Sequence, residues 1–531
     1  MKLNKKIDIG IIINSQLNFN DSDIEIYKNI FFDQTIRIKT IFFYDEKIIN
    51  NYFKKNLFNF FLRKLIFFLE KKFITISRTK ELKKIINIIK KTPKKRIDIV
   101  NINNSGVDFV LKDYIYKDKI DLIINLNNFA IIGQFNYLAK FGMLNCTIGY
   151  NYFRSFPEGF YESFSDKNGY SKILIYVNKK NKNYLLDQGI YDKKIYWALN
   201  YSFLNEKKIS IFLKNFFLYK KNFLLNKKKL FNIDKNNFFA PGLFQLINYI
   251  IFKYLFSYIK NILIKNNNRW FLGLDHRKYF LDFKFNKNLK FEKNANRADP
   301  FLIYYKSKKY VFFENIKKNG IGQIAAGEID QNNCLIDTNI ILSKKYNLSY
   351  PFVFFYKKKF FLIPETSQKK NIQIYISCKF PYKWRLFKTL FKGESIADPT
   401  FVEFNNNLWM FANKSLDKYN DHNSELYIYK VKGLFNKFIP HAKNPVLHDS
   451  RSARSAGNFF RSQNNNYIRP SQINIHNTYG FGLNLNKIIK LSLKNYLEKK
   501  IRSFTPSIKN NFRKVHHLSV NRSNYIFDYK F

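Results

Sequence analysis

The carboxylates that could do chemistry in this chain stand in a repeated tripeptide. Ala-Asp-Pro occurs at Asp299 and again at Asp398, each time in front of two apolar runs separated by a short polar turn. Glycoside hydrolysis requires a pair of carboxyl groups with different protonation states. The sequence therefore offers Asp299 as a base and Asp398 as a residue that tunes or positions it. Glu365 or Glu314 would supply the acid.

The same carboxylates have a second interpretation. An Asp at the start of a strand can accept hydrogen bonds from the backbone N–H groups of a turn, which is a structural role. A carboxylate can equally bind the hydroxyl groups of a sugar without any catalysis. Catalysis, sugar binding and structural support therefore remain open for Asp299, Asp398 and Glu365.

The elements that carry these residues recur every fifty residues or so. Each unit has an apolar strand, a polar turn, a second strand that begins at an aromatic residue, and usually a third strand. A period of roughly fifty residues is typical of the four-stranded blades of a β-propeller. Four units are visible, and we expect "NRWFLGL" (268–274) and "NRSNYIFDYKF" (521–531) to pair as a fifth blade.

The prolines of the repeat suggest where the acidic side chains point. Proline cannot donate to a β-ladder, so we expect Pro300, Pro351 and Pro399 at the first residue of a strand. If this strand is the innermost one of each blade, the residue before the proline faces the axial channel. Asp299 and Asp398 would then share one pocket.

The first two hundred residues have a different pattern. Short apolar runs such as "IDIGIIIN" and "DLIINLN" alternate with helical spacing such as "FFLRKLIFFLEKKF". Strands separated by helices predict a parallel α/β sheet with a ligand site at the carboxyl ends of its strands. We therefore expect an α/β domain over 1–199, a basic helical connector over 200–265 and a five-bladed propeller over 266–531.

Composition limits the function classes. A formal charge of +53 would suit a protein that binds nucleic acid or an anionic membrane. The positive excess is mostly Lys, however, and it accompanies many Asn, Ile, Phe and Tyr residues, which is the composition that AT-rich coding favours. No nucleic-acid motif is present, so we expect no specific nucleic-acid partner. No apolar run reaches the length of a membrane helix, and the nearest, "LFQLINYIIFKYLFSYIKNILI", is interpreted as an amphipathic helix with peripheral membrane contact left open.

Cysteine and histidine usage adds two expectations. The three cysteines are odd in number and lack metal-ligand spacing, which predicts neither a disulfide framework nor a zinc site and fits a cytoplasmic protein. All seven histidines lie beyond residue 275. His516 and His517 are assigned a core or surface role rather than metal binding. No metal is predicted, and the sequence identifies no cofactor.

Several motifs of the second half resemble a known family. "ADPFLI", "LSYPFVF", "FPYKWRL", "ADPTFVEFNNNLWMFA", "HAKNPVLHDSRSARSAGNFFR" and "YIRPSQ" occur in the order found in the propeller of glucosamine inositolphosphorylceramide transferases. The resemblance covers about residues 265–531. It implies a carbohydrate-related five-bladed propeller, distantly similar to the arabinanase and fructosidase clans of glycoside hydrolases.

The first half resembles the formyltransferase fold over about residues 1–195. "DLIINLNNFAIIGQFNYLAKFGMLNCTIGY" is similar to the segment that carries an Asn-x-His pair in that family, and "YLLDQGI" to its Asp-x-Gly segment. The resemblance implies catalytic roles for Asn145 and Asp187. Thr147 stands where the family has His, and this departure argues against folate-dependent formyl transfer, which needs a group that exchanges a proton near neutral pH.

Polar residues of two segments are the expected substrate contacts. In the loop "IGYNYFRSFPEGFYE" they are Asn151, Arg154 and Glu162, and in the Arg-rich segment of the second half they are Arg451, Arg454, Arg469 and Gln472. Arginine suits bidentate recognition of a carboxylate or phosphate. The alternative is that these arginines pair with Asp299, Asp398 and Asp449 to hold blades together.

Together these patterns predict a carbohydrate- or glycolipid-modifying protein. We favour a transferase with a formyltransferase-like or glycosyltransferase-like donor domain and a glycan-recognising propeller. The alternative is a propeller glycoside hydrolase, or a non-catalytic glycan-binding protein, with a degenerate first domain. The expected partner is a sugar or glycolipid substrate.

Overall fold

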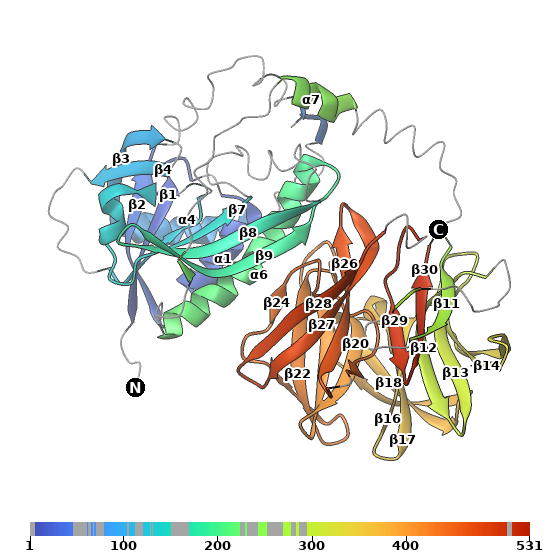
Figure 1. Ribbon diagram of the computed structural model, residues 1–531. Helices are drawn as coiled ribbons and strands as arrows, with labels where there is room; N and C mark the ends of the chain where they lie inside the picture. Colours follow the sequence, from blue (N-terminus) through green and yellow to red (C-terminus); the bar gives the residue numbers. More distant parts are fainter. Residues whose placement is uncertain are drawn as a thin grey trace. The chain divides into compact units, whose positions relative to one another are not determined.

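The computed structural model divides the chain into two compact units, residues 1–265 and 266–531 (Figure 1). The described residues are 6–17, 19–45, 61, 65–66, 68–70, 79–103, 106–111, 120–127, 129, 131–149, 169–222, 229–230, 243–251, 269–277, 283–285, 295–462, 464–506 and 512–530. The expected limit between 199 and 200 falls inside helix α6 (Trp197–Asn222), which packs on strands of the first unit.

The first unit is built on a ten-stranded mixed sheet with the order β10-β9-β8-β7-β5-β1-β2-β3-β4-β6. Its strands are β1 (Ile7–Asn14), β2 (Ile36–Tyr44), β3 (Lys94–Asn103), β4 (Gly106–Leu111), β5 (Leu122–Asn125), β6 (Ile131–Ile132), β7 (Met143–Ile148), β8 (Tyr170–Lys179), β9 (Lys182–Asp192) and β10 (Lys229–Leu230). The apolar runs of the sequence supply its buried centre, since every residue of β1, β5 and β7 is buried.

The expectation of a parallel sheet was correct only for the centre and for the short edge pair of β4 with β6. Strands β3, β2, β1, β5 and β7 are parallel, whereas β3 with β4 and β7 through β10 pair antiparallel. Two residues with positive φ, Lys180 and Asn181, join β8 to β9. So short a connection makes a hairpin, because a parallel pair needs a crossover of a dozen or more residues.

Three helices of the first unit lie side by side: α4 (Thr79–Lys91), α1 (Asp21–Phe31) and α6. The Asn20 side chain caps α1 by accepting a hydrogen bond from the Asp23 backbone at 2.8 Å. The buried Lys208 ammonium of α6 lies 2.9 Å from the Asp23 carboxylate. This ion pair joins α6 to the start of α1. The unit also contains α7 (Leu243–Ile250) and the 3₁₀ helix η2 (Gly133–Tyr137).

The second unit consists of five small antiparallel sheets, which confirms the five-bladed propeller. The first blade along the chain contains β12 (Arg297–Tyr305), β13 (Lys308–Ile316), β14 (Gly322–Ile329) and β15 (Leu335–Leu342), and the second contains β16 (Ser349–Tyr356), β17 (Lys359–Glu365), β18 (Ile372–Lys379) and β19 (Lys383–Leu390). The third contains β20 (Ser395–Phe404), β21 (Asn407–Ser415), β22 (Glu425–Lys432) and β23 (Lys437–Pro440), with β24 (Leu447–His448) beside β22, and the fourth contains β25 (Phe460–Arg461), β26 (Tyr467–Ile475), β27 (Thr478–Leu491) and β28 (Tyr496–Phe504). The fifth contains β11 (Phe271–His276), β30 (Asn524–Tyr529) and β29 (Leu518–Asn521). The 3₁₀ helix η4 (Ser367–Lys369) follows β17.

The fifth blade is closed by the two ends of the unit. Strand β11 pairs antiparallel with β30 from Phe271 opposite Tyr529 to His276 opposite Asn524, and Figure 1 draws the two strands side by side. This pairing confirms the expected partnership of "NRWFLGL" with the C-terminal strand. Joining the two ends in one blade closes the ring, so that each blade packs its faces against two neighbours.

The first hairpin of three blades uses the same turn. Lys306 and Ser307 lie between the first and second strands of one blade, two lysines at 357–358 in the next, and two asparagines at 405–406 in the third, all with positive φ. Two successive residues with positive φ form a type I′ turn, which matches the twist of the strands it joins. The polar turns of the repeat are therefore tight hairpin loops.

The cysteines are free, with Cys146 buried and Cys378 exposed. Among the described residues, helices that combine the length and the apolar character of a membrane span were not found.

Candidate functional site

The centre of the propeller is lined by the residues that precede the repeated prolines. Asp299, Tyr350 and Asp398 have φ values of 51°, 46° and 48°, and at each of them the register of the first strand slips against the second. A β-bulge of this kind leaves its extra residue out of the ladder and re-aims the side chain. The first strands of neighbouring blades contact one another, so these bulges lie on the inner ring.

The prolines occupy a different place from the one expected. Pro300, Pro351 and Pro399 lie inside β12, β16 and β20, directly after the bulged residue, and not at the first residue of the strand. The bulge already interrupts the ladder, so the missing N–H of proline leaves no partner unsatisfied. The proline therefore marks the bulge.

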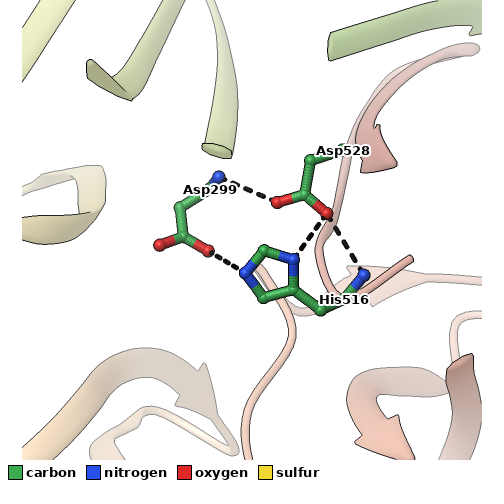
Figure 2. Close-up of side chains that lie close together, drawn as sticks. All are labelled: Asp299, His516 and Asp528. Carbon is green, nitrogen blue, oxygen red and sulfur yellow. Dashed lines mark hydrogen bonds and ion pairs between the residues drawn. The ribbon is translucent and has the colours of Figure 1, made fainter. Parts of the chain in front are cut away.

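Asp299 belongs to a chain of buried charged groups in which His516 is central (Figure 2). His516 Nε2 lies 3.2 Å from Asp299 Oδ1, and His516 Nδ1 lies 2.9 Å from Asp528 Oδ1. His517 Nδ1 approaches the same Asp299 oxygen at 3.5 Å. The Asp528 carboxylate also accepts hydrogen bonds from the backbone N–H groups of Asp299, His516 and His517 at 3.0–3.2 Å.

These contacts fix the charges of the cluster. Burial opposes ionisation of Asp299, but hydrogen bonds and charges from His516 and His517 outweigh it and lower the pKa of this carboxyl far below its usual value. Burial likewise disfavours a charged His516, but Asp528 and Asp299 outweigh it and raise the pKa of His516 to about 10. At neutral pH the cluster therefore holds a protonated His516 beside an ionised Asp299.

Two aromatic rings enclose the His516 imidazole. The ring centroid of Trp270 lies 4.1 Å from that of His516, and the ring centroid of Tyr479 lies 5.1 Å from it. Aromatic faces attract a cation, so both rings favour the charged imidazolium. Trp270 also lies beneath the ammonium of Lys530, at 4.6 Å.

A second cluster surrounds Asp398. Arg454 Nε donates to Asp398 Oδ2 at 2.7 Å, Arg454 Nη1 donates to Asn423 Oδ1 at 3.0 Å, and Arg454 Nη2 reaches Glu365 Oε2 at 3.5 Å. Burial raises the pKa of Asp398; Arg454 opposes this and Glu365 adds to it, so that the pKa is about 7. Near neutral pH this carboxyl group can therefore gain or lose a proton.

Tyr479 connects the two clusters. Its ring lies beside His516 and under the Arg454 guanidinium, which is 5.0 Å from the ring centroid, and its hydroxyl accepts a hydrogen bond from Gln472 at 3.5 Å. Tyr479 is 37% exposed, whereas the carboxylates around it are largely buried. A partly exposed tyrosine beside buried carboxylates and an arginine is suited to contact a sugar ring while the polar groups bind its hydroxyl groups.

Glu314 is a further carboxyl group at this centre. Burial, together with the nearby Asp299, raises the pKa of Glu314 well above its usual range. Gly322 leaves the space it needs, since an added Cβ at this glycine would lie 2.2 Å from Glu314 Oε1. Burial and the negative charge of Asp299 therefore favour the protonated, neutral form of Glu314.

The ligand atoms of Asp299, His516 and Asp528 lie within 4.8 Å of one another, which suits a metal ion by distance alone. Among the described residues these three side chains form an internal ion-pair chain, in which Asp528 also accepts three backbone N–H groups. A metal ion at this position would have to displace the proton of His516, because an imidazole binds a metal only in its neutral form.

The other predicted arginines bind within their own blade. Arg469 is buried and forms two hydrogen bonds to Glu498 at 2.8 and 2.7 Å, in addition to one with the Ser452 carbonyl. Arg451 is half-exposed and pairs with Asp449 at 2.9 Å. The arginine at the central cluster is Arg454.

Asp187 and Asn145, the predicted catalytic residues of the first unit, bond to side chains of that unit. Asp187 Oδ2 accepts from Lys214 at 3.0 Å and from Asn215 at 2.9 Å, which ties strand β9 to helix α6. Asn145 is buried and accepts from Asn125 at 2.9 Å. Asn151, Arg154 and Glu162 lie outside the described residues.

Sequence reasoning missed two members of the site, Asp528 and Tyr479, and it favoured a core or surface role for His516. A usable signal was present for His516. The adjacent histidines 516–517 stand out in a chain with seven His. They lie directly before strand β29, in the same way that each Ala-Asp pair lies directly before a proline of the repeat. Tyr479 follows a turn in a Tyr-rich chain and has no distinguishing pattern.

The Tyr350 hydroxyl helps to hold the inner strands of the propeller together through hydrogen bonds. It bonds to Thr400 Oγ1 at 2.7 Å and accepts from the Gly457 backbone N–H at 3.1 Å, which links three blades. We expect Tyr350→Phe to lower the free energy of unfolding by about 2 kcal/mol, because a buried N–H loses its partner while the aromatic ring is kept.

Chemical denaturation of the purified chain would measure this cost. Tyr356→Phe, in the outer half-buried part of the same strand, is the matched control and should cost less than about 0.5 kcal/mol. Equal losses in the two variants would contradict the role given to the hydroxyl of Tyr350.

Residues 286–525 match a known family. Its description is Glucosamine inositolphosphorylceramide transferase 1, N-terminal. The relative from Oryza sativa subsp. japonica named glucosamine inositolphosphorylceramide transferase 1 is 32% identical over 207 residues, which are 38% of this chain and 27% of the relative. The Arabidopsis thaliana protein of the same name is 30% identical over 207 residues, 38% of this chain and 26% of its own length. The chain thus spans about a quarter of the length of the curated relatives it matches.

Solved structures give a weaker likeness. A family 117 glycoside hydrolase produced by the marine bacterium Zobellia galactanivorans has a TM-score of 0.33 at 10% identity, covering 49% of this chain and 91% of the hydrolase. The β-xylosidase RS223 has a TM-score of 0.33 at 11% identity, covering 44% and 92%. The propeller architecture therefore rests on the order of the five sheets. These matches give no support to the expected formyltransferase type of the first unit.

Proposed function

We propose that this chain acts in the modification of a carbohydrate or glycolipid, as a transferase whose propeller holds the sugar part of the substrate. The observation that carries the proposal is the pair of clusters joined by Tyr479, with a charged Asp299 on one side and Asp398 with a pKa of about 7 on the other. The match of residues 286–525 to the glucosamine inositolphosphorylceramide transferase family supports a glycolipid-related role.

The side chains of the site have complementary tasks in this proposal. Asp299, which stays ionised, accepts a hydrogen bond from a sugar hydroxyl. Asp398 donates one in its protonated form and accepts one in its ionised form. Arg454 keeps Asp398 and Glu365 in place, and the exposed part of Tyr479 packs against the ring of the sugar. No step of this binding requires a cofactor.

Formyl transfer is not part of the proposal. The first 275 residues contain no His, and the Asp187 carboxylate is engaged by Lys214 and Asn215. A general base near neutral pH is therefore missing among the residues that the resemblance suggested. We propose that the first unit contributes to donor binding through the carboxyl edge of its parallel strands, where α/β sheets bind ligands.

Glycoside hydrolysis is the second candidate. One observation favours it: the site contains a carboxyl group whose pKa is lowered and another whose pKa is raised to about 7, the separation that an acid–base pair needs. Asp398 would act as the acid and Asp299 as the base or nucleophile. In this assignment the acid differs from the Glu365 or Glu314 that the sequence suggested.

Thermal unfolding with a panel of sugars tests the proposal. A ligand that binds only the native state at about 100 times its Kd stabilises by about 2.7 kcal/mol. Neutral or acidic oligosaccharides, or the headgroups of glycolipids, should raise the melting temperature of the chain, and Asp299→Asn or Asp398→Asn should abolish the shift. Asp449→Asn, in the half-exposed pair with Arg451, is the control that should keep it.

The outcomes separate the candidates. A shift by a nucleotide sugar that disappears in Asp187→Ala would assign the donor to the first unit. Release of free sugar that is lost in Asp299→Asn would favour hydrolysis over transfer. Melting-temperature shifts with oligosaccharides that persist in both propeller variants would refute a sugar site at this centre.

We also propose that the protein is cytoplasmic, and cell fractionation would test this location.

A further inference from the structure

Two helical segments of the first unit share a buried inner face. The first contains the helical residues 61, 65, 66 and 68–70, and the second is α7. Their inner side chains form a cluster with the start of α6, made of Ile66, Trp197, Ala198, Leu246 and Tyr249. The buried Glu70 accepts from Tyr249 Oη at 2.8 Å and from the Ala198 backbone N–H at 2.7 Å. Both segments are thereby fixed to α6.

The outer faces of the same segments are also apolar. They expose Phe61, Leu65, Phe68 and Leu69 on the first, and Phe244, Ile247 and Ile251 on and directly after α7. In α7 and the residue after it, the spacing i, i+3, i+7 places the three side chains along one helix face. We call these seven residues the apolar stripes. Phe68 is 73% exposed and Phe244 is 76% exposed.

This arrangement is unusual for a helix on a protein surface. A surface helix normally has one apolar face toward the core and a polar face toward water, and a helix that is apolar on both sides is covered by something. The stripes contribute seven of the 21 large hydrophobic side chains that are exposed among the described residues. Water alone is therefore an unfavourable environment for this surface.

The charge of the flanking sequence indicates what covers the apolar stripes. Residues 54–72 contain six Lys or Arg and residues 243–265 contain three, against a single acidic residue, Glu70, which is buried. Aromatic and aliphatic side chains flanked by basic residues are the composition of helices that lie in the headgroup region of anionic bilayers. Each basic residue near such a surface adds electrostatic attraction.

We propose that the apolar stripes are a docking surface for a membrane containing anionic phospholipids. The helices lie parallel to the bilayer, with Phe68 and Phe244 inserted among the headgroups and the inner face still packed on Trp197. The proposal is independent of the sugar site in the propeller. A membrane surface is nevertheless where the lipid part of a glycolipid would be anchored.

Vesicle sedimentation of the full chain tests this surface. We expect the chain to bind vesicles of phosphatidylcholine mixed with phosphatidylserine, to bind phosphatidylcholine alone at least tenfold more weakly, and to be released as salt rises from about 0.1 M to about 0.5 M. Phe68→Ser together with Phe244→Ser should weaken binding to the mixed vesicles about tenfold or more. Both side chains are exposed, so the melting temperature of this variant should stay unchanged.

Matched controls make the result specific. Phe355→Ser with Leu386→Ser removes two large apolar side chains exposed on propeller strands and should bind vesicles like the parent chain. Asp398→Asn should also bind normally, since the vesicles contain no sugar lipid. Equal loss in the stripe variant and the control, or no binding to anionic vesicles, would overturn the proposal. A concentration-dependent dimer that the stripe variant abolishes, without vesicle binding, would assign the surface to a second copy and overturn it too.

Discussion

Replacing Arg454 with methionine is expected to lower the free energy of unfolding by about 3 kcal/mol and to abolish sugar binding. The reason is that one guanidinium serves Asp398, Glu365 and Asn423. The side chain of Asp398 is 2% exposed and that of Glu365 is 13% exposed, so neither carboxylate can recover its interactions from water. Removing one partner of a buried ion pair is costly because it leaves an uncompensated charge behind.

Denaturant unfolding at pH 8 measures this loss most directly, because Asp398 is then mainly ionised. Arg451→Met is the matched control: it breaks a half-exposed pair with Asp449 and should cost less than about 1 kcal/mol. Arg454→Lys should recover only part of the stability, since an ammonium lacks the planar fork that reaches all three acceptors. Wild-type stability of Arg454→Met would remove the ion-pair interpretation of this cluster.

Replacing His516 with glutamine is expected to destabilise the propeller by about 3 kcal/mol at pH 6.5, with the loss shrinking as pH rises toward 10. His516 is the cation between Asp299 and Asp528, both of which are buried. The pKa of about 10 in the folded chain lies above the unfolded value of about 6.5. The neutral amide keeps hydrogen-bonding capacity and loses the charge, so the two carboxylates repel each other uncompensated.

The sign of the pH dependence follows from proton linkage. Between pH 6.5 and 10 the folded chain binds more protons at His516 than the unfolded chain does. The stabilisation from this group is therefore complete below about pH 6.5 and is lost as pH rises through about 10. Only the difference between the parent chain and His516→Gln isolates this effect, because Asp398, with its folded pKa raised to about 7, also loses stabilisation as pH rises.

Urea unfolding at several pH values in this window would measure the difference. His476→Asn, at an exposed turn position with positive φ, is the control and should change stability by less than about 0.5 kcal/mol at every pH. A constant difference between the parent chain and His516→Gln from pH 6.5 to 10 would show that His516 is not held as an imidazolium.

The repeat of the second half was sufficient to predict the propeller. Its period, the polar turns and the pairing of the two ends as a fifth blade are all local or terminal features, and the sheets follow them closely. The position of the prolines within their strands was predicted wrongly, because a proline at a strand start and a proline after a bulge have the same sequence environment. Positive φ at Asp299 and Asp398 decides between them, and it arises from the packing of the inner ring.

The first unit shows where periodicity stops being informative. Its central parallel strands were evident as apolar runs, but the hairpin at Lys180 and Asn181 has neither glycine nor the other usual turn dipeptides. Nothing in the composition distinguished this turn from an exposed loop. The antiparallel flank of the sheet, and with it the departure from an all-parallel domain, was therefore visible only in three dimensions.

The sequence by itself determined which residue types reach the centre of the propeller, since the blade repeat places Asp299 and Asp398 at equivalent positions. Only the tertiary structure decided their partners. Asp299 meets His516 and Asp528 from the other end of the unit, and Asp398 meets Arg454 from the next blade. These contacts join residues between 56 and 229 positions apart; ring closure forms those of Asp299, and the packing of neighbouring blades forms that of Asp398. The protonation states, on which any chemistry at the site depends, follow from these contacts because burial and charge are properties of neighbours in space.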